Sequence, residues 1–123
     1  IKKIIKKQTL IVYGEGKQKR DFIYVEDVAM GIYKALQSHN HGVYQLSTGE
    51  STSINQLLKI LNNTVLDTHQ FRVKYVKKRK GEIFETLISN NKAKSKINFK
   101  INTKLDEGIK TTWEWLIANQ NYI

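Results

Sequence analysis

The sequence has no cysteine and no proline, and none of its apolar runs approaches 18 residues. The lack of cysteine excludes a disulfide-stabilised scaffold, a Cys-ligated zinc or iron–sulfur site and thiol chemistry. The lack of a long apolar run excludes a transmembrane helix. Residues 1–7 interrupt isoleucine with lysine, unlike the apolar centre of a signal peptide, so we expect a cytoplasmic protein with no membrane partner.

Arginine and acidic residues are also scarce. The chain has 21 Lys plus Arg against 11 Asp plus Glu, a formal net charge of +10, and its only arginines are Arg20, Arg72 and Arg79. The positive charge points to an anionic partner, such as a nucleic acid or a phosphorylated ligand. Base readout and bidentate phosphate contacts favour arginine over lysine. We therefore interpret most of the charge as a solvated lysine-rich surface and keep nucleic-acid binding as the less favoured alternative.

What is present is the composition of one globular domain. The chain is 123 residues long, 40% hydrophobic and 26% charged, and it shows no repeat, no low-complexity stretch and no linker. We therefore expect residues 1–123 to form a single domain. The first residue is Ile rather than Met, and we expect the chain to be a piece of a longer protein.

Residue periodicity predicts the element order β–β–α–β–α–β–α–α, an α/β fold with short strands and about four helices. The predicted strands are 9–13, 20–25, 43–47 and 71–76. The predicted helices follow residue 25 and Ser53, cover 89–96, and follow Thr103. The glycines within residues 14–17 are typical of a turn, so residues 9–25 are predicted to form a β-hairpin.

Two of the predicted helices begin with a capping-box pattern. Ser53 is followed three residues later by Gln56, and Thr103 by Asp106, so each hydroxyl is placed to accept a hydrogen bond from the first helical turn. Helical spacing then gives each helix one apolar face. These faces consist of Ile54, Leu57, Leu58 and Leu61 in the first helix, and Leu105, Ile109, Trp113 and Leu116 in the second.

The three histidines, His39, His41 and His69, are the only candidates for a nitrogen-ligated metal. A His-x-His pair in a polar loop could contact a metal, but no neighbouring carboxylate or cysteine completes a site. We interpret them as exposed loop residues and expect no metal. The sequence also has no Gly-x-Ser-x-Gly segment and no cysteine nucleophile, so we expect no catalytic residue in this chain.

Gly14-Glu15-Gly16 follows a predicted strand, as the phosphate loop of a dinucleotide site does. The third glycine is absent, Lys19 stands at its position, and a strand follows in place of a helix, so no helix N-terminus faces a pyrophosphate. Tyr13 and Lys17 have the Tyr-x-x-x-Lys spacing, but that pair needs a helix to place both side chains on one face. We interpret both patterns as coincidences and expect no cofactor to bind this chain alone.

Arg20 and Arg79 are a candidate pair for binding a diphosphate. Each guanidinium can bind phosphate oxygens bidentately, Glu82 could accept hydrogen bonds from ribose hydroxyls, and Gly81 would let the backbone pass close to a ligand. The two arginines lie 59 positions apart, and chemistry alone does not bring them together. Two solvated cations remain the simpler interpretation at this point.

Residues 10–29 closely resemble a signature of the NAD-dependent epimerase/dehydratase family, the extended short-chain dehydrogenases that act on nucleotide-diphosphate sugars. The signature is a Gly-x-Gly turn, Arg-Asp-Phe, a short strand and a helix that opens with Asp-Val-Ala. Three later segments, 43–54, 79–82 and 105–115, resemble the family in the same order. The resemblance covers roughly residues 9–117 and is greatest to UDP-sugar 4-epimerases.

The resemblance implies that this chain is the C-terminal, substrate-binding part of such an enzyme, together with a late strand of its Rossmann sheet at 43–47. The family's NAD-binding glycine turn and catalytic Tyr-x-x-x-Lys belong to an N-terminal Rossmann half that this sequence does not contain. The resemblance therefore implies a full-length parent that binds NAD, an N-terminal half as partner, and a C-terminal part that is inactive alone. It leaves a homodimer open.

By the same resemblance, Arg20 and Arg79 contact the diphosphate and Glu82 contacts the ribose. Thr86 matches a position that lines the sugar pocket of UDP-sugar 4-epimerases, where a residue smaller than an aromatic implies room for an N-acetyl group. We therefore predict a nucleotide-diphosphate sugar, a UDP-sugar, as the ligand. The alternative is a freestanding basic module for nucleic acid or another polyanion. The sequence does not separate an epimerase from a dehydratase or a decarboxylase.

Overall fold

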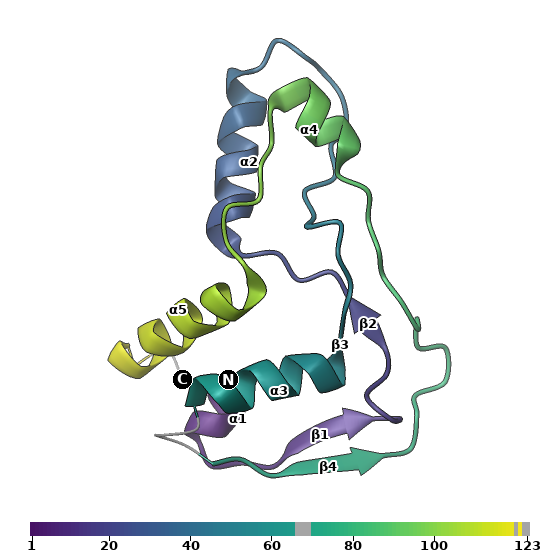
Figure 1. The fold of residues 1–123 in the computed structure, drawn as a ribbon, viewed down its shortest axis with the longest axis vertical. Helices are drawn as coiled ribbons and strands as arrows, with labels where there is room; N and C mark the ends of the chain where they lie inside the picture. Colours follow the sequence, from purple (N-terminus) through teal and green to yellow (C-terminus); the bar gives the residue numbers. More distant parts are fainter. Residues whose placement is uncertain (66–69, 120, 122–123) are drawn as a thin grey trace.

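The computed structural model describes residues 1–65, 70–119 and 121. Its elements are α1 (Lys2–Ile5), β1 (Leu10–Tyr13), β2 (Lys19–Arg20), α2 (Val25–Gln37), β3 (Thr52–Ser53), α3 (Ile54–Val65), β4 (Val73–Val76), α4 (Asn91–Ile97) and α5 (Leu105–Ala118). This is the mixed α/β arrangement that the sequence predicts, with the short helix α1 in addition and the third strand at Thr52–Ser53 in place of the predicted 43–47 (Figure 1).

β1 and β4 pair as parallel strands, with Leu10 opposite Val73 and Tyr13 opposite Val76. Parallel neighbours need a long crossover, and here the crossover contains α2, β3 and α3. Because the strands are parallel, their carboxyl ends lie at the same edge. The turn after Tyr13 and the basic loop after Val76 therefore begin side by side, and Gly14 N donates to the Val76 carbonyl (2.8 Å).

The predicted β-hairpin over residues 9–25 is wrong. β2 does not return along β1 but pairs antiparallel with β3. The reason lies in the turn between β1 and β2, where the Gly16 carbonyl accepts from Asn55 N (3.0 Å) and the Gln18 carbonyl accepts from Ile54 N (3.1 Å). These hydrogen bonds direct the chain onto the start of α3 and away from β1.

The segment 43–47 is not the strand that its composition predicts. A β-strand needs a neighbour to bond its backbone, and within the described residues no strand pairs with this segment. Side chains hold it instead. Ser47 Oγ donates to the Ile88 carbonyl (2.8 Å), and the buried Asn90 donates through Nδ2 to the Ser47 carbonyl (2.7 Å).

The predicted helices are present. α3 begins with the predicted capping box, in which Ser53 N donates to Gln56 Oε1 (2.9 Å) and Gln56 N donates to Ser53 Oγ (3.1 Å). α4 covers Asn91–Ile97, close to the predicted 89–96. Helical spacing and the capping box were therefore sufficient to place α3.

The second predicted capping box, Thr103 with Asp106, is wrong, because Lys104 precedes α5 and no side chain caps this helix. The Thr103 N–H instead donates to the buried carboxylate of Asp27 (3.1 Å), which also accepts from Asn102 N (3.1 Å). Asp27, in the first turn of α2, thereby holds the segment that leads into α5.

Two clusters of buried side chains form the interior. The larger cluster joins α1, α3 and α5 through Ile4, Leu61, Val65, Ile109 and Trp113. The smaller cluster is formed by Ala93, Ile97 and Phe99 beside α2. Figure 1 shows α2 and α4 at the end of the molecule opposite β1 and β4. In the part of the chain that the structure describes, no helix is long and apolar enough to span a membrane.

Candidate functional site

The carboxyl ends of β1 and β4 bring Tyr13 and Arg79 together. Tyr13 ends β1, and Arg79 lies in the loop that follows β4. The guanidinium carbon of Arg79 lies 3.7 Å from the centroid of the Tyr13 ring, a cation–π contact. A hydrogen bond from Arg79 and the charge of its guanidinium hold the pKa of the Tyr13 phenol below its usual value. This contact places one predicted site residue at the edge of the sheet.

Glu82 shares a cavity of about 300 Å³ with Tyr13. The lining residues are Tyr13, Gly14, Glu15, Lys17, Gln18, Lys78, Glu82 and Phe84. The volume lies at the lower limit for a small-molecule site. Arg79 lies over the Tyr13 ring but is not among the residues that line the cavity, whereas Glu82 lines it together with Tyr13.

Within this cavity, Lys17 and Glu15 neutralise each other. Their charged atoms are 2.7 Å apart. The hydrogen bond between them lowers the pKa of the Glu15 carboxyl and raises the pKa of the Lys17 ammonium. Tyr13 and Lys17, which have the Tyr-x-x-x-Lys spacing, are thus a strand residue and a turn residue, and the lysine is engaged by a carboxylate.

The turn over residues 14–18 does not fit a dinucleotide phosphate. Such a site needs backbone N–H groups that point at the ligand from a helix N-terminus. Here the N–H groups of Ile54 and Asn55 at the start of α3 already donate to carbonyls of the turn. A side chain on Gly16 would collide with Asn55 Oδ1, so the turn and the helix are in close contact. The N–H groups of Ile54 and Asn55 are therefore engaged within the protein and do not offer the donors of a phosphate-binding helix N-terminus.

Arg20 and Thr86 meet at the Lys19 carbonyl. This oxygen accepts from Arg20 Nη1 (2.7 Å) and from Thr86 N (3.1 Å). Lys19 N in turn donates to the carbonyl of Phe84 (2.7 Å), a residue that lines the cavity. The stretch from Glu82 to Thr86 therefore runs from the cavity to the strand that carries Arg20.

The four predicted site residues thus form two pairs. Arg79 contacts the Tyr13 ring and Glu82 lines a cavity with Tyr13, while Arg20 and Thr86 donate to the Lys19 carbonyl. Neither Arg20 nor Arg79 lines this cavity, so it is not a pocket on which both arginines converge. Sequence reasoning missed the contact of Tyr13 with Arg79. An aromatic residue at the end of a strand is a weak signal until the partner strand is known.

The aspartates of the family signature have structural partners. Asp21 Oδ1 accepts from Thr48 N (2.9 Å) and Thr48 Oγ1 (2.6 Å), and its Oδ2 accepts from Gly49 N (3.0 Å). This carboxylate ends β2 at Arg20, short of the predicted strand over 20–25. Asp21 therefore fixes the direction in which the chain leaves the strand that carries Arg20.

The two histidines that the structure describes do not belong to a metal-binding group. His39 and His41 are exposed, and His69 lies outside the described residues. Among the residues that the structure describes, no group of three or more histidine, aspartate and glutamate side chains is placed to hold a metal ion.

Comparison with known proteins extends the resemblance over nearly the whole chain. The GDP-mannose 4,6 dehydratase family matches residues 1–112. A Methanocaldococcus jannaschii protein, provisionally named a UDP-glucose 4-epimerase, is 36% identical over 121 residues, which are 97% of this chain and 38% of that protein. The chain spans under two-fifths of the length of the curated relatives it matches.

Solved structures of similar fold also match nearly the whole chain. A UDP-N-acetylglucosamine 4-epimerase from Methanobrevibacter ruminantium, in complex with UDP-N-acetylmuramic acid, superimposes with a TM-score of 0.87 at 32% identity and covers 96% of this chain and 37% of its own. MoeE5, in complex with UDP-glucuronic acid and NAD, gives a TM-score of 0.86 at 26% identity, with 96% and 40% covered. The chain belongs to the GDP-mannose 4,6-dehydratase family, and its fold is that of the C-terminal part of the extended short-chain dehydrogenases.

Proposed function

We propose that this chain binds the diphosphate and ribose of a nucleotide-diphosphate sugar, a UDP-sugar, as the C-terminal part of an NAD-dependent epimerase or dehydratase. One observation carries the proposal. Arg79 lies over the ring of Tyr13, Tyr13 and Glu82 both line a cavity of about 300 Å³, and the backbone from Glu82 leads to Thr86, which donates to the residue before Arg20. Cationic and acidic groups in this arrangement match a phosphorylated sugar.

Both arginines currently donate to the protein itself. Arg79 contacts the Tyr13 ring, and Arg20 donates to the Lys19 carbonyl. A diphosphate offers charged oxygens, whose hydrogen bonds to guanidinium are stronger than those of neutral acceptors. On binding, the two guanidinium groups exchange their present contacts for phosphate oxygens. Glu82 accepts from ribose hydroxyls, and the small side chain of Thr86 beside Arg20 leaves room for an N-acetyl substituent.

The catalytic groups and the NAD site are proposed to belong to an N-terminal part, because the turn over 14–18 does not fit NAD and the relatives are longer than this chain. Two features of this chain support a further part of the protein that packs against it. The outer face of α2 exposes Val25, Ile32 and Leu36 by 69%, 53% and 81%. Residues 43–47 have a strand composition and no strand partner among the described residues. The second feature fits an added strand of a neighbouring sheet.

The proposal is tested by titrating the 123-residue chain with UDP-glucose and measuring affinity by calorimetry. Arg79→Ala is expected to weaken binding by about tenfold, because a charge-assisted hydrogen bond is lost. Arg72→Ala is the matched control. It removes the same charge from an exposed residue that precedes β4, at the opposite end of that strand from Arg79. An unchanged affinity in Arg79→Ala would remove Arg79 from the site.

The same titration separates the polyanion alternative. Polyanion binding falls steeply with salt and is indifferent to the uridine base. The proposed site prefers UDP over inorganic pyrophosphate and responds to Arg79 more than to Arg72. If both arginine variants lose affinity equally and pyrophosphate binds as well as UDP, the sugar-nucleotide proposal fails and a general basic surface replaces it.

A further inference from the structure

Residues 84–86 run as a third strand-like segment beside β2. Lys19 is hydrogen-bonded to this segment through both of its backbone groups. Its N–H donates to the Phe84 carbonyl (2.7 Å), and its carbonyl accepts from Thr86 N (3.1 Å). The bridge between Lys19 and Glu85 is parallel, and on its other edge Lys19 pairs with Ser53 of β3. β2 therefore lies between β3 and the segment that continues from Glu82.

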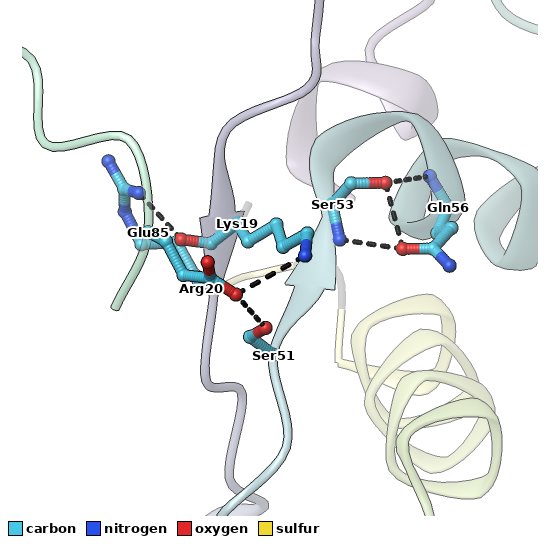
Figure 2. A network of polar contacts seen from close by, with 6 residues as sticks. All are labelled: Lys19, Arg20, Ser51, Ser53, Gln56 and Glu85. Carbon is cyan, nitrogen blue, oxygen red and sulfur yellow. Dashed lines mark hydrogen bonds and ion pairs between the residues drawn. The ribbon is translucent and has the colours of Figure 1, made fainter. Parts of the chain in front are cut away.

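Three side chains meet on one face of this small sheet. Ser51 Oγ donates to Glu85 Oε1 (2.6 Å), and Lys19 Nζ lies 3.3 Å from the same oxygen. Figure 2 shows the hydroxyl and the ammonium converging on the Glu85 carboxylate. The hydrogen bond from Ser51, followed by that from Lys19, lowers the pKa of Glu85 below its ordinary value. The carboxylate is therefore charged at neutral pH.

Arg20 and Thr86, two of the predicted ligand residues, lie on the opposite face. Successive side chains of a strand point to opposite faces of a sheet, so Arg20 and Thr86 face away from Lys19 and Glu85. Figure 2 shows the Arg20 guanidinium on the other side of β2 from the Lys19 ammonium. The contact of Ser51, Lys19 and Glu85 thus joins β2 to its neighbours on the face of the sheet opposite Arg20.

We propose that Lys19, Ser51 and Glu85 form a positioning clip that fixes the register between the strand carrying Arg20 and the segment carrying Glu82 and Thr86. The inference rests on the proposed function, because it concerns the geometry of that same site. None of the three residues is expected to touch the ligand. They act through Arg20, Glu82 and Thr86.

The register needs such a device. Only two backbone hydrogen bonds join Lys19 to this segment, and the residues from Lys77 to Ile83 form neither helix nor strand. A slip of one residue exchanges the two faces of a strand. It would turn the charged Glu85 toward Arg20 and away from Lys19, where the carboxylate would compete with phosphate for the guanidinium. The clip opposes this slip.

The first test uses the unliganded chain and the hydrogen exchange of the Thr86 amide, which donates to Lys19. Glu85→Ala is expected to speed this exchange, because the segment is fastened less firmly. The control is Lys110→Glu, which breaks an exposed Lys–Glu pair (Lys110 with Glu114, 4.0 Å) on α5. It should leave the Thr86 amide unchanged. Equal exchange in Glu85→Ala and the unsubstituted chain overturns the clip.

The second test measures UDP-glucose affinity by calorimetry. Glu85→Ala and Lys19→Glu are each expected to weaken binding by about two- to fivefold, the size of an exposed ion pair. The exchanged pair, Lys19→Glu with Glu85→Lys, is expected to restore most of the affinity, which a general loss of structure would not do.

The outcomes separate the inference from the function on which it rests. If the unsubstituted chain does not bind UDP-glucose, the proposed function fails and the inference fails with it. If the chain binds UDP-glucose and the single variants bind equally well, the proposed function stands and the clip is wrong. Weakened single variants without recovery in the exchanged pair also overturn the clip, since the charge pairing would then not be its basis.

Discussion

The two ends of the molecule are built differently. At one end, α1, α3 and α5 close around the larger cluster, in which Ile4 and Val65 are fully buried. At the other end, the smaller cluster beside α2 has only three buried members, and α2 exposes an apolar stripe on its outer face. The first end, called here the closed end, surrounds its buried side chains with three helices. The second, the open end, leaves apolar side chains of α2 exposed.

This difference explains where the candidate site can lie. The turn over 14–18 is bonded to the start of α3, so the cavity beside Tyr13 is attached to the closed end. Its geometry therefore depends on groups within this chain. No residue of α2 lines that cavity. The candidate site is therefore positioned by contacts within this chain, whereas α2 leaves apolar side chains exposed.

The largest effect is expected at the closed end. Trp113 is 6% exposed, and Trp113→Ala is expected to lower the free energy of unfolding by about 3–5 kcal/mol, through lost burial and the cavity left behind. Trp115, 50% exposed on the same helix, provides the matched control. Trp115→Ala should lower the free energy of unfolding by clearly less. Urea unfolding followed by circular dichroism measures both. Equal costs would show that this end is not closed around Trp113.

The open end is tested with a surface substitution on α2. Leu36→Lys should change the free energy of unfolding by no more than about 0.5 kcal/mol, because the side chain is exposed and both residues favour helix. It should lower the fluorescence of a bound apolar dye. Gln37→Lys, a neighbouring exposed position with the same added charge, is the control. A large loss of stability in Leu36→Lys would mean that Leu36 packs within this chain.

The smallest effect concerns the ionisation of Tyr13. Arg79→Ala should raise the pKa of the Tyr13 phenol toward its usual value, because the hydrogen bond and the charge of Arg79 are removed. The lowered pKa stabilises the folded chain only at alkaline pH, as the phenol ionises, and this contribution is lost as the pH falls through the folded-state pKa. Stability at neutral pH should therefore hardly change.

The measurement is an NMR titration of the Tyr13 ring. Saturating UDP should raise the Tyr13 pKa in the same direction as Arg79→Ala, since the guanidinium leaves the ring for the phosphates. Arg72→Ala is the control and should leave the pKa of Tyr13 unchanged. A Tyr13 titration that neither Arg79→Ala nor UDP moves would contradict the contact between the two side chains.

Local sequence patterns were sufficient for the helices. Apolar spacing predicted α2, α3 and α5, and the reciprocal bonds of Ser53 with Gln56 follow from residues three apart. The ordered motifs were also sufficient to indicate the family, which the match over residues 1–112 confirms. The roles of Arg20, Arg79, Glu82 and Thr86 stay predictions.

Long-range contacts determine the strand pairing and the contacts of the loops. The strand pattern after Leu10 could not indicate whether the partner would be the next segment or β4, more than 60 positions away, because alternation describes a face and not a neighbour. For the same reason, the sequence did not reveal that the Thr103 N–H donates to Asp27 or that Arg79 contacts the Tyr13 ring. Helices bond within themselves and can be recognised locally. Strands and loop contacts bond to distant residues, so their partners become known only when the chain is folded.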